Sequence, residues 1–159
     1  NIIYNAEAKF SWLEDFEGAS TSFLYTAGSD TIFNRQSVTL KEGNFSGQVY
    51  LENEMNFFEA ISVPFNDLPI GETVYLELDF ITNENIIVGV YLDGEQFAFI
   101  TLNVSSDWNK IYINLKDVLK SKTNSSEVKV FIGLKEEGGT VFKTDKPEVY
   151  IDNVKLVHY

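Results

Sequence analysis

Two carboxylates, Glu77 and Asp79, stand at alternate positions of a segment rich in β-forming residues. Alternate positions of a strand point to the same face of a sheet, so the two side chains are expected side by side. A neighbouring pair of carboxylates is what glycoside hydrolysis requires, with one as general acid and the other as nucleophile or base. The same pattern also describes the solvated outer face of an ordinary strand.

Other groups that could carry catalysis are scarce. The sequence has no Cys and a single His, His158, next to the last residue. A catalytic triad needs an imidazole that is oriented by a carboxylate and faces a nucleophile, which a chain end does not favour. A hydrolytic zinc site needs two or three His ligands. We therefore predict that the protein is not an enzyme.

A second group of residues suggests binding instead. Aromatic side chains are expected at outward positions of several strands, and Trp108 is expected in a loop before its strand; the candidate carbohydrate-binding residues are Tyr75, Tyr91, Trp108, Tyr112 and Phe131. Aromatic rings stack on the apolar face of a sugar, while nearby carboxylates and amides bind its hydroxyls. The alternative is that they form ordinary cross-strand pairs, covered by another part of the chain.

Length and charge restrict the classes of partner. The 159 residues are the size of one ordinary domain, and we predict a single domain over residues 1–159. The 24 acidic and 12 basic residues give a net charge of −12, which disfavours nucleic acid and anionic membranes. Such acidity suits solubility or a hard cation such as calcium. No apolar run approaches the ~20 residues of a transmembrane helix.

Hydrophobic alternation with a period of two predicts the strands. It is clearest in three segments: Thr73–Phe80, Ile111–Leu115 and Val128–Leu134. In each of them apolar residues alternate with residues that face the other way, which is typical of half-buried antiparallel strands. Helix is expected only as one or two turns, in Leu115–Ser121.

Asp93-Gly94 separates two segments rich in β-formers, Ile86–Leu92 and Glu95–Leu102. A two-residue Asp-Gly link accommodates the positive φ angles of a type I′ turn, so it predicts a hairpin. Together with the alternating segments, this hairpin indicates an all-β fold, an antiparallel β-sandwich.

The last segment, Glu148–Tyr159, has an irregular alternation. Val149 and Ile151 share one face, but Val154 and Leu156 continue it one residue out of phase. A β-bulge at Asp152-Asn153 would produce this slip and would re-aim the Asp152 side chain. A simple bend of the strand is the alternative.

Three motifs resemble jelly-roll carbohydrate-binding modules and galactose-binding-like domains, and the middle one also resembles uncharacterised surface lipoproteins of Bacteroides-type bacteria. These motifs lie at the beginning, the middle and the end of the chain: Trp12–Gly18 with its Phe16-Glu17 pair, Asp107–Leu115, and Val149–Val157 with its Ile-Asp-Asn-Val core. The resemblance implies a jelly-roll sandwich whose first and last strands lie together. Glu77 and Asp79 also resemble the acidic strand of a jelly-roll glycosidase family, but Ile81 and Thr82 stand where its third carboxylate belongs. We therefore favour the solvated-strand interpretation.

The resemblance also implies a structural calcium ion. In such domains an acidic residue near the first strand and another in the last strand often bind Ca²⁺, and the matching residues are Glu17 and Asp152. Backbone carbonyls of a loop such as Glu42–Asn44 would add ligands, because Ca²⁺ takes 6–8 oxygens. The alternative is that both carboxylates cap turns or accept backbone hydrogen bonds.

These observations predict a non-catalytic binding module of a secreted or surface-anchored bacterial protein, with a glycan as its ligand. Because the chain begins at Asn1 without Met, we expect a mature product from which any signal peptide or lipid anchor has been removed. The alternative function is a protein-interaction or adhesin-like scaffold domain of an envelope lipoprotein with no sugar ligand.

Overall fold

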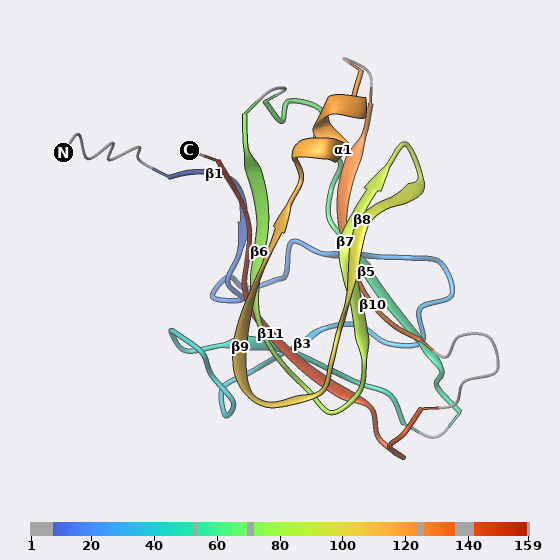
Figure 1. Cartoon of the computed structure of the whole chain (residues 1–159). Coiled ribbons are helices and arrows are strands. Elements are labelled where there is room, and N and C mark those ends of the chain that lie inside the picture. The colour runs from blue at the N-terminus through green and yellow to red at the C-terminus, as the bar shows by residue number, and fades with distance from the viewer. Residues whose placement is uncertain (1–7, 53, 70–71, 124–125, 136–141, 159) are drawn as a thin grey trace.

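The computed structural model describes residues 8–52, 54–69, 72–123, 126–135 and 142–158. Within these residues, the strands form two antiparallel sheets that pack face to face (Figure 1). The six-stranded sheet has the order β3–β4–β11–β6–β9, with β1 also paired to β11; the bounds are β1 Lys9–Glu14, β3 Asn34–Gln36, β4 Ser46–Tyr50, β6 Val74–Thr82, β9 Ser105–Asn114 and β11 Glu148–His158. The five-stranded sheet has the order β2–β5–β10–β7–β8; the bounds are β2 Leu24–Tyr25, β5 Phe57–Ile61, β7 Ile86–Leu92, β8 Glu95–Leu102 and β10 Val128–Lys135. The predicted all-β antiparallel sandwich is confirmed.

The predicted alternation fills the space between the sheets. Even-numbered apolar residues of β6 and of β10 are buried and belong to one hydrophobic core; they are Val74, Leu76, Leu78, Phe80, Val128, Val130, Ile132 and Leu134. The short helix α1 (Lys116–Ser121) follows β9, close to the segment expected to be helical. Within the described part of the chain, no helix combines the length and hydrophobicity needed to cross a membrane.

The predicted hairpin is confirmed. β7 and β8 have the predicted bounds, and the two turn residues have positive φ angles, 51° for Asp93 and 86° for Gly94. Positive φ at both central residues is the signature of a type I′ turn. This hairpin forms one edge of the five-stranded sheet.

The last strand, β11, joins the two ends of the chain. On the side away from β6 it pairs with β4 along Glu148–Ile151 and with β1 along Val154–His158. Its pairing with β6 shifts between Asp152 and Lys155, and Asn153 has a φ of 51°. The predicted bulge and the expected pairing of first and last strands are both confirmed.

The segment after β1 is held by buried groups. Phe16 has a φ of 59°, and its amide donates to Glu14 Oε1 at 2.7 Å. The ring of Phe16 fills the space over Gly47, where a Cβ would lie 2.3 Å from the ring carbons. Any side chain at position 47 would therefore displace the ring. Phe16 also packs in a cluster of aromatic rings with Phe23 and Phe33.

Candidate functional site

Tyr91 and Phe131 lie together on the outer face of the five-stranded sheet. Their ring centroids are 4.7 Å apart at an interplanar angle of 42°. Phe131 is only 1% exposed, whereas Tyr91 is partly exposed. Of this pair, Tyr91 therefore presents an aromatic ring to solvent, and Phe131 supports it from the side.

A buried carboxylate completes this face. Glu59 of β5 accepts hydrogen bonds from Thr26 Oγ1 at 2.6 Å and from the Tyr91 hydroxyl at 2.9 Å. The Tyr91 oxygen in turn accepts a hydrogen bond from Gln96 Nε2 at 3.2 Å. Burial raises the pKa of Tyr91, so its hydroxyl remains a proton donor at neutral pH. The result is a chain of hydrogen-bonding groups beside a supported ring.

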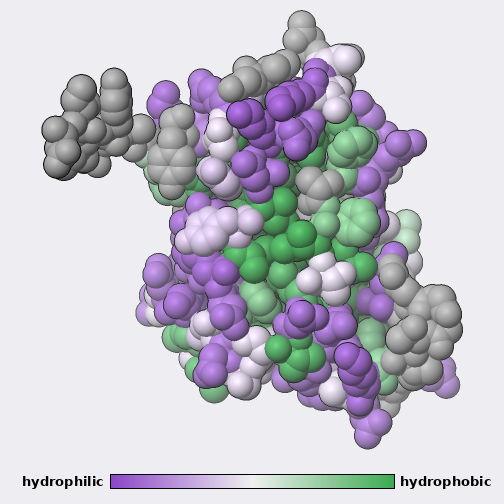
Figure 2. All heavy atoms as spheres, viewed as in Figure 1, coloured by the Kyte–Doolittle hydropathy of each residue, from purple (hydrophilic) through white to green (hydrophobic). Residues whose placement is uncertain are grey.

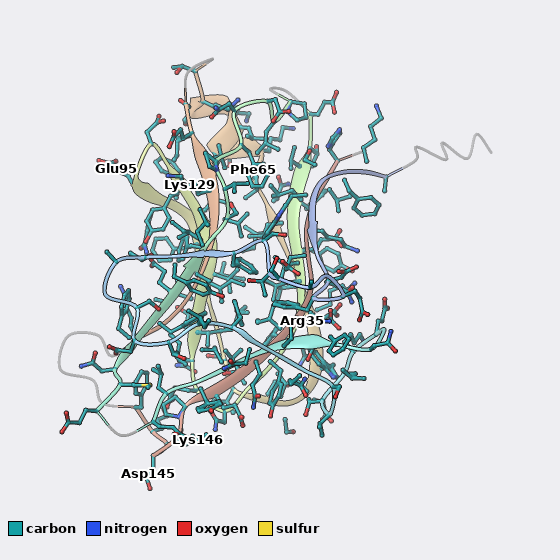
Figure 3. All side chains as sticks on the ribbon, turned by 180° about the vertical axis from the view of Figure 1, so that it is seen from behind. Arg35, Phe65, Glu95, Lys129, Asp145 and Lys146 are labelled. Atoms are coloured by element: carbon teal, nitrogen blue, oxygen red, sulfur yellow. The ribbon has the colours of Figure 1, made fainter. Side chains whose placement is uncertain are left out.

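We call this surface the Tyr91 face and define it by Thr26, Glu59, Tyr91, Gln96 and Phe131. Gly133 stands opposite Glu59 on β10, and a Cβ there would lie 3.9 Å from Glu59 Oε2. A longer side chain at that position would fill the space that the carboxylate uses. Lys129 stands opposite Tyr91 at the rim of the face and pairs with Glu127 at 3.3 Å (Figure 3).

Tyr75 and Tyr112 lie on the other sheet. They occupy the outer face of β6 and β9, where Tyr75 stands opposite Asn114 and Tyr112 opposite Glu77. Tyr112 is 60% exposed. The structure therefore divides these candidate residues between opposite faces of the sandwich. Tyr91 and Phe131 lie on one face, and Tyr75 and Tyr112 lie on the other, so the four do not share one groove.

The expected position of Trp108 is wrong. The structure places it inside β9, which begins at Ser105, and not in a loop before the strand. The pairing of β9 with β6 shifts between Phe80 and Thr82, and the strand continues through the polar Ser105-Ser106-Asp107 segment.

Glu77 and Asp79 lie on the outer face of β6, as expected, but the prediction that they are solvated is wrong. Both are buried; Glu77 pairs with Lys155 at 3.4 Å and Asp79 with Lys110 at 3.5 Å. These lysines belong to the neighbouring strands β11 and β9 and cover the carboxylates. The pair is thus engaged in ion pairs across the sheet.

A second cluster, the acidic pocket, lies where the segment after β1 meets the bulge of β11. It is a small open cavity of about 160 Å³ lined by Asp15, Glu17, Glu42, Gly43, Asp152 and Asn153. The structure therefore brings Glu17 and Asp152, predicted as calcium ligands, to one cavity beside the predicted loop. Arg35 of β3 (labelled in Figure 3) holds the segment between Asp15 and Glu17 by donating to the carbonyl oxygen of Phe16 at 2.8 Å.

Both carboxylates bind the same loop through its backbone amides. Glu17 Oε1 accepts from the amides of Asn44 at 2.7 Å and Phe45 at 2.9 Å, and Asp152 Oδ2 accepts from the amide of Glu42 at 3.2 Å. The amides of Asn44 and Phe45 hold the pKa of Glu17 below its ordinary value. The loop is thus fixed from two sides of the pocket.

The pKa of Asp152 is shifted in the opposite direction from that of Glu17. Burial raises its pKa from 3.8 to about 6, although the amides of Glu42 and Asn153 act in the other direction. Asp79 stands directly opposite Asp152 on β6 and raises the pKa further. One oxygen of Asp79, Oδ1, is buried without a hydrogen-bond partner among the described residues. Negative charge is therefore concentrated between β6 and β11.

The fit of a metal ion to this pocket is partial. Among the residues that the structure describes, no three Asp, Glu, His or Cys side chains converge as a metal site. The backbone groups directed at Glu17 and Asp152 are amides and not the expected carbonyls. Each ionised carboxylate nevertheless has about four acceptor positions, so the observed hydrogen bonds leave some of them free.

A wider hollow of about 550 Å³ lies beside the beginning of β5 and is lined by Asp30, Glu52, Glu54 and Met55. Asp30 accepts from the amides of Asn56 and Phe57, and Glu52 pairs with Lys146. Two of its three carboxylates thus have structural partners already, and we assign it no function.

Sequence reasoning missed several residues of these sites. Glu59 gave no signal, because the groups that donate to it, Thr26 and Tyr91, lie 33 and 32 positions away in the sequence. For the acidic pocket, Asp15 and Arg35 were missed.

The fold is the jelly-roll β-sandwich of carbohydrate-binding modules. The second family 22 xylan-binding domain of Xyn10C from Paenibacillus barcinonensis shares 17% identity, with a TM-score of 0.64 over 93% of this chain and 99% of that one. The family 11 carbohydrate-binding module of the cellulosomal cellulase Lic26A-Cel5E from Clostridium thermocellum shares 13% identity, with a TM-score of 0.61 over 96% and 95%. The module TmCBM61, solved with β-1,4-galactotriose, shares 13% identity, with a TM-score of 0.58 over 95% and 91%. No protein-family model and no curated protein sequence matches the chain.

Proposed function

We propose that the protein is a non-catalytic glycan-binding module and that the Tyr91 face holds the sugar. The observation that carries this proposal is the chain of hydrogen bonds from Gln96 through Tyr91 to Glu59, beside a ring supported by Phe131. Sugars need such a combination, because one side of a pyranose is apolar and its rim carries hydroxyls. The structural likeness to a xylan-binding domain and to a module solved with β-1,4-galactotriose supports the same class of ligand.

The Tyr91 face is favoured over the outer face of the six-stranded sheet because its polar groups are arranged for a ligand. On the six-stranded sheet, the carboxylates beside Tyr112 are ion-paired with Lys155 and Lys110. On the Tyr91 face, the tyrosine hydroxyl and the Gln96 amide lie at the surface, next to the exposed side of the ring.

The experiment is affinity electrophoresis against soluble polysaccharides, including xylan and β-1,4-galactan, with Tyr91→Ala and Tyr112→Ala as a matched pair. Stacking that covers ~100 Å² of apolar surface contributes about 2.5 kcal/mol, so Tyr91→Ala is expected to weaken retention by about 50-fold or more. Tyr112→Ala removes an aromatic ring from the opposite sheet and is expected to leave retention unchanged.

One further variant and two alternative outcomes complete this experiment. Tyr91→Phe keeps the ring but removes the hydroxyl, and it is expected to weaken retention by about two- to tenfold. If Tyr112→Ala weakens retention and Tyr91→Ala does not, the site lies on the six-stranded sheet. If no polysaccharide in a broad panel is retained, the alternative of a scaffold or adhesin-like domain without a sugar ligand is favoured.

We also propose that the acidic pocket binds Ca²⁺ through Glu17 and Asp152, with Asp15 and Glu42 adding negative charge. The concentration of carboxylates around one small cavity supports this proposal. Because the loop amides already occupy part of both carboxylates, we expect affinity in the millimolar range.

Calcium at ten times its dissociation constant stabilises a folded protein by about 1.4 kcal/mol, which corresponds to a rise in Tm of about 3–6 °C for a chain of this size. The rise should be smaller with Mg²⁺, which demands a stricter octahedral geometry. Glu17→Gln and Asp152→Asn should both abolish it, whereas Asp117→Asn, on the exposed face of α1, should retain it. An equal rise in all three variants would contradict the site.

We further propose that the module belongs to a secreted or cell-surface bacterial protein. Polysaccharides such as xylan are found outside the cell, and the compared modules are a xylan-binding domain of Xyn10C and a module of a cellulosomal cellulase. Fractionation of the native host, with detection of the protein in medium or envelope, tests this proposal.

A further inference from the structure

The eight-residue strand β8 is an unusual edge. In the five-stranded sheet it pairs only with β7, and the opposite edge, β2, has two residues. In the six-stranded sheet, β3 has three residues and β9 carries Asp107 and Lys110. Natural edge strands are usually shortened or protected by charge or proline, because their free backbone groups pair with other strands. Beyond Glu95, β8 has no charge and no proline, and its protection is limited to the irregularity in its pairing near Phe99.

Exposed apolar side chains are concentrated on this strand and directly after it. Of the eleven large hydrophobic residues that are exposed in the described part of the chain, four lie within residues 96–104: Phe97 at 39%, Phe99 at 52%, Ile100 at 36% and Val104 at 52%. Figure 2 shows hydrophobic residues reaching the surface in the middle of this side of the molecule, between β9 and β8 as they appear in Figure 1. Surfaces of this kind mark contacts with another molecule.

The charge distribution favours a second copy of the chain as the occupant. Each molecule carries a net charge of −12, so most surfaces of two copies repel one another. Residues 96–106, however, contain no charged residue. Two β8 edges can therefore approach without placing carboxylates opposite each other.

We propose that two copies associate through β8, which pairs antiparallel with itself about a two-fold axis. Antiparallel pairing of two identical strands is self-complementary and closes at two molecules. It would join the two five-stranded sheets into one continuous sheet and cover Phe99 and its neighbours. The irregularity of β8 near Phe99 twists the edge but places no charge on it. This inference does not depend on glycan binding.

Sedimentation equilibrium from about 5 to about 500 μM tests the proposal, since modest interfaces associate in this range. The wild-type mass should rise toward twice 18.1 kDa with concentration. Phe99→Lys should weaken association at least tenfold, because it brings two lysines close to the axis. The matched control is Phe10→Lys, which changes a Phe that is 57% exposed on β1 and should leave association unchanged.

A wild-type protein that stays monomeric at every concentration overturns the proposal, as does a Phe99→Lys variant that associates as strongly as the wild type. Loss of association in both lysine variants also overturns it, since the interface would then not be specific to β8. If Phe99→Lys fails to fold, hydrogen exchange in the wild type decides. Amides of Phe97–Leu102 should exchange more slowly at high protein concentration, and no change there contradicts the β8 interface.

Discussion

Replacing Phe58 by alanine is expected to lower the free energy of unfolding by about 3–5 kcal/mol. Phe58 is completely buried on β5, and its ring packs edge-on against Phe33 with centroids 5.0 Å apart and against Tyr25 at 6.3 Å. Removing the ring leaves a cavity that the rigid aromatic cluster can close only in part. The loss is a large share of the total stability of about 5–15 kcal/mol that is usual for a domain.

Urea denaturation followed by circular dichroism measures this effect, with Phe10→Ala as the control. Phe10 is also a strand phenylalanine, but it is 57% exposed on β1, so its replacement should change the free energy of unfolding by less than about 1 kcal/mol. Similar losses in the two variants would contradict the assignment of the aromatic cluster as the centre of the core.

The contribution of Asp152 to the free energy of unfolding, measured in the presence of a chelator, is expected to fall as the pH rises from about 4 to about 7. Its pKa is 3.8 in the reference state and about 6 in the folded protein, where burial disfavours the charged form. The folded state therefore binds the proton more tightly than the unfolded state in this window. The associated stability is fully present below pH 3.8 and is lost as the pH rises through 6; its upper limit is about 3 kcal/mol, which solvent screening at the open pocket reduces.

Asp152→Asn removes this titration. The free energy of unfolding is measured by urea denaturation at several pH values. Between pH 4 and pH 7, the value for the variant should therefore rise relative to that of the wild type. The two proteins are compared by how the free energy of unfolding changes with pH and not by its absolute value. Asparagine keeps only one of the two oxygens that accept from the amides of Glu42 and Asn153, so the variant also loses a hydrogen bond at every pH. Parallel curves for the two proteins would show that Asp152 does not titrate in this range.

Local sequence signals predicted the parts of the fold that depend on neighbours along the chain. Asp93-Gly94 predicted the hairpin because the turn conformation is a property of those two residues. The phase slip at Asp152-Asn153 predicted the bulge because alternation is also local. The pairing of the two chain ends followed from the family resemblance alone.

The division of the aromatic residues between two faces could not be predicted in this way. Alternation shows that Tyr75 and Tyr91 point away from the core, but it does not show which sheet each strand joins. β6 and β7 follow one another in sequence and yet enter different sheets, since β6 pairs with β11 and β9 whereas β7 pairs with β10 and β8. The same limit explains Glu77, whose burial depends on Lys155, nearly eighty positions away.

The pairing of β1 with β11 also determines how the module responds to mechanical tension. Lys9 and His158 are partners in that antiparallel pair, so the two ends of the described chain leave the molecule side by side. A pull on both ends would load the hydrogen bonds between β1 and β11 one after another, as in opening a zipper, and would not shear them all together. β1 would therefore detach under low force, while the two sheets that carry the Tyr91 face and the core remain folded.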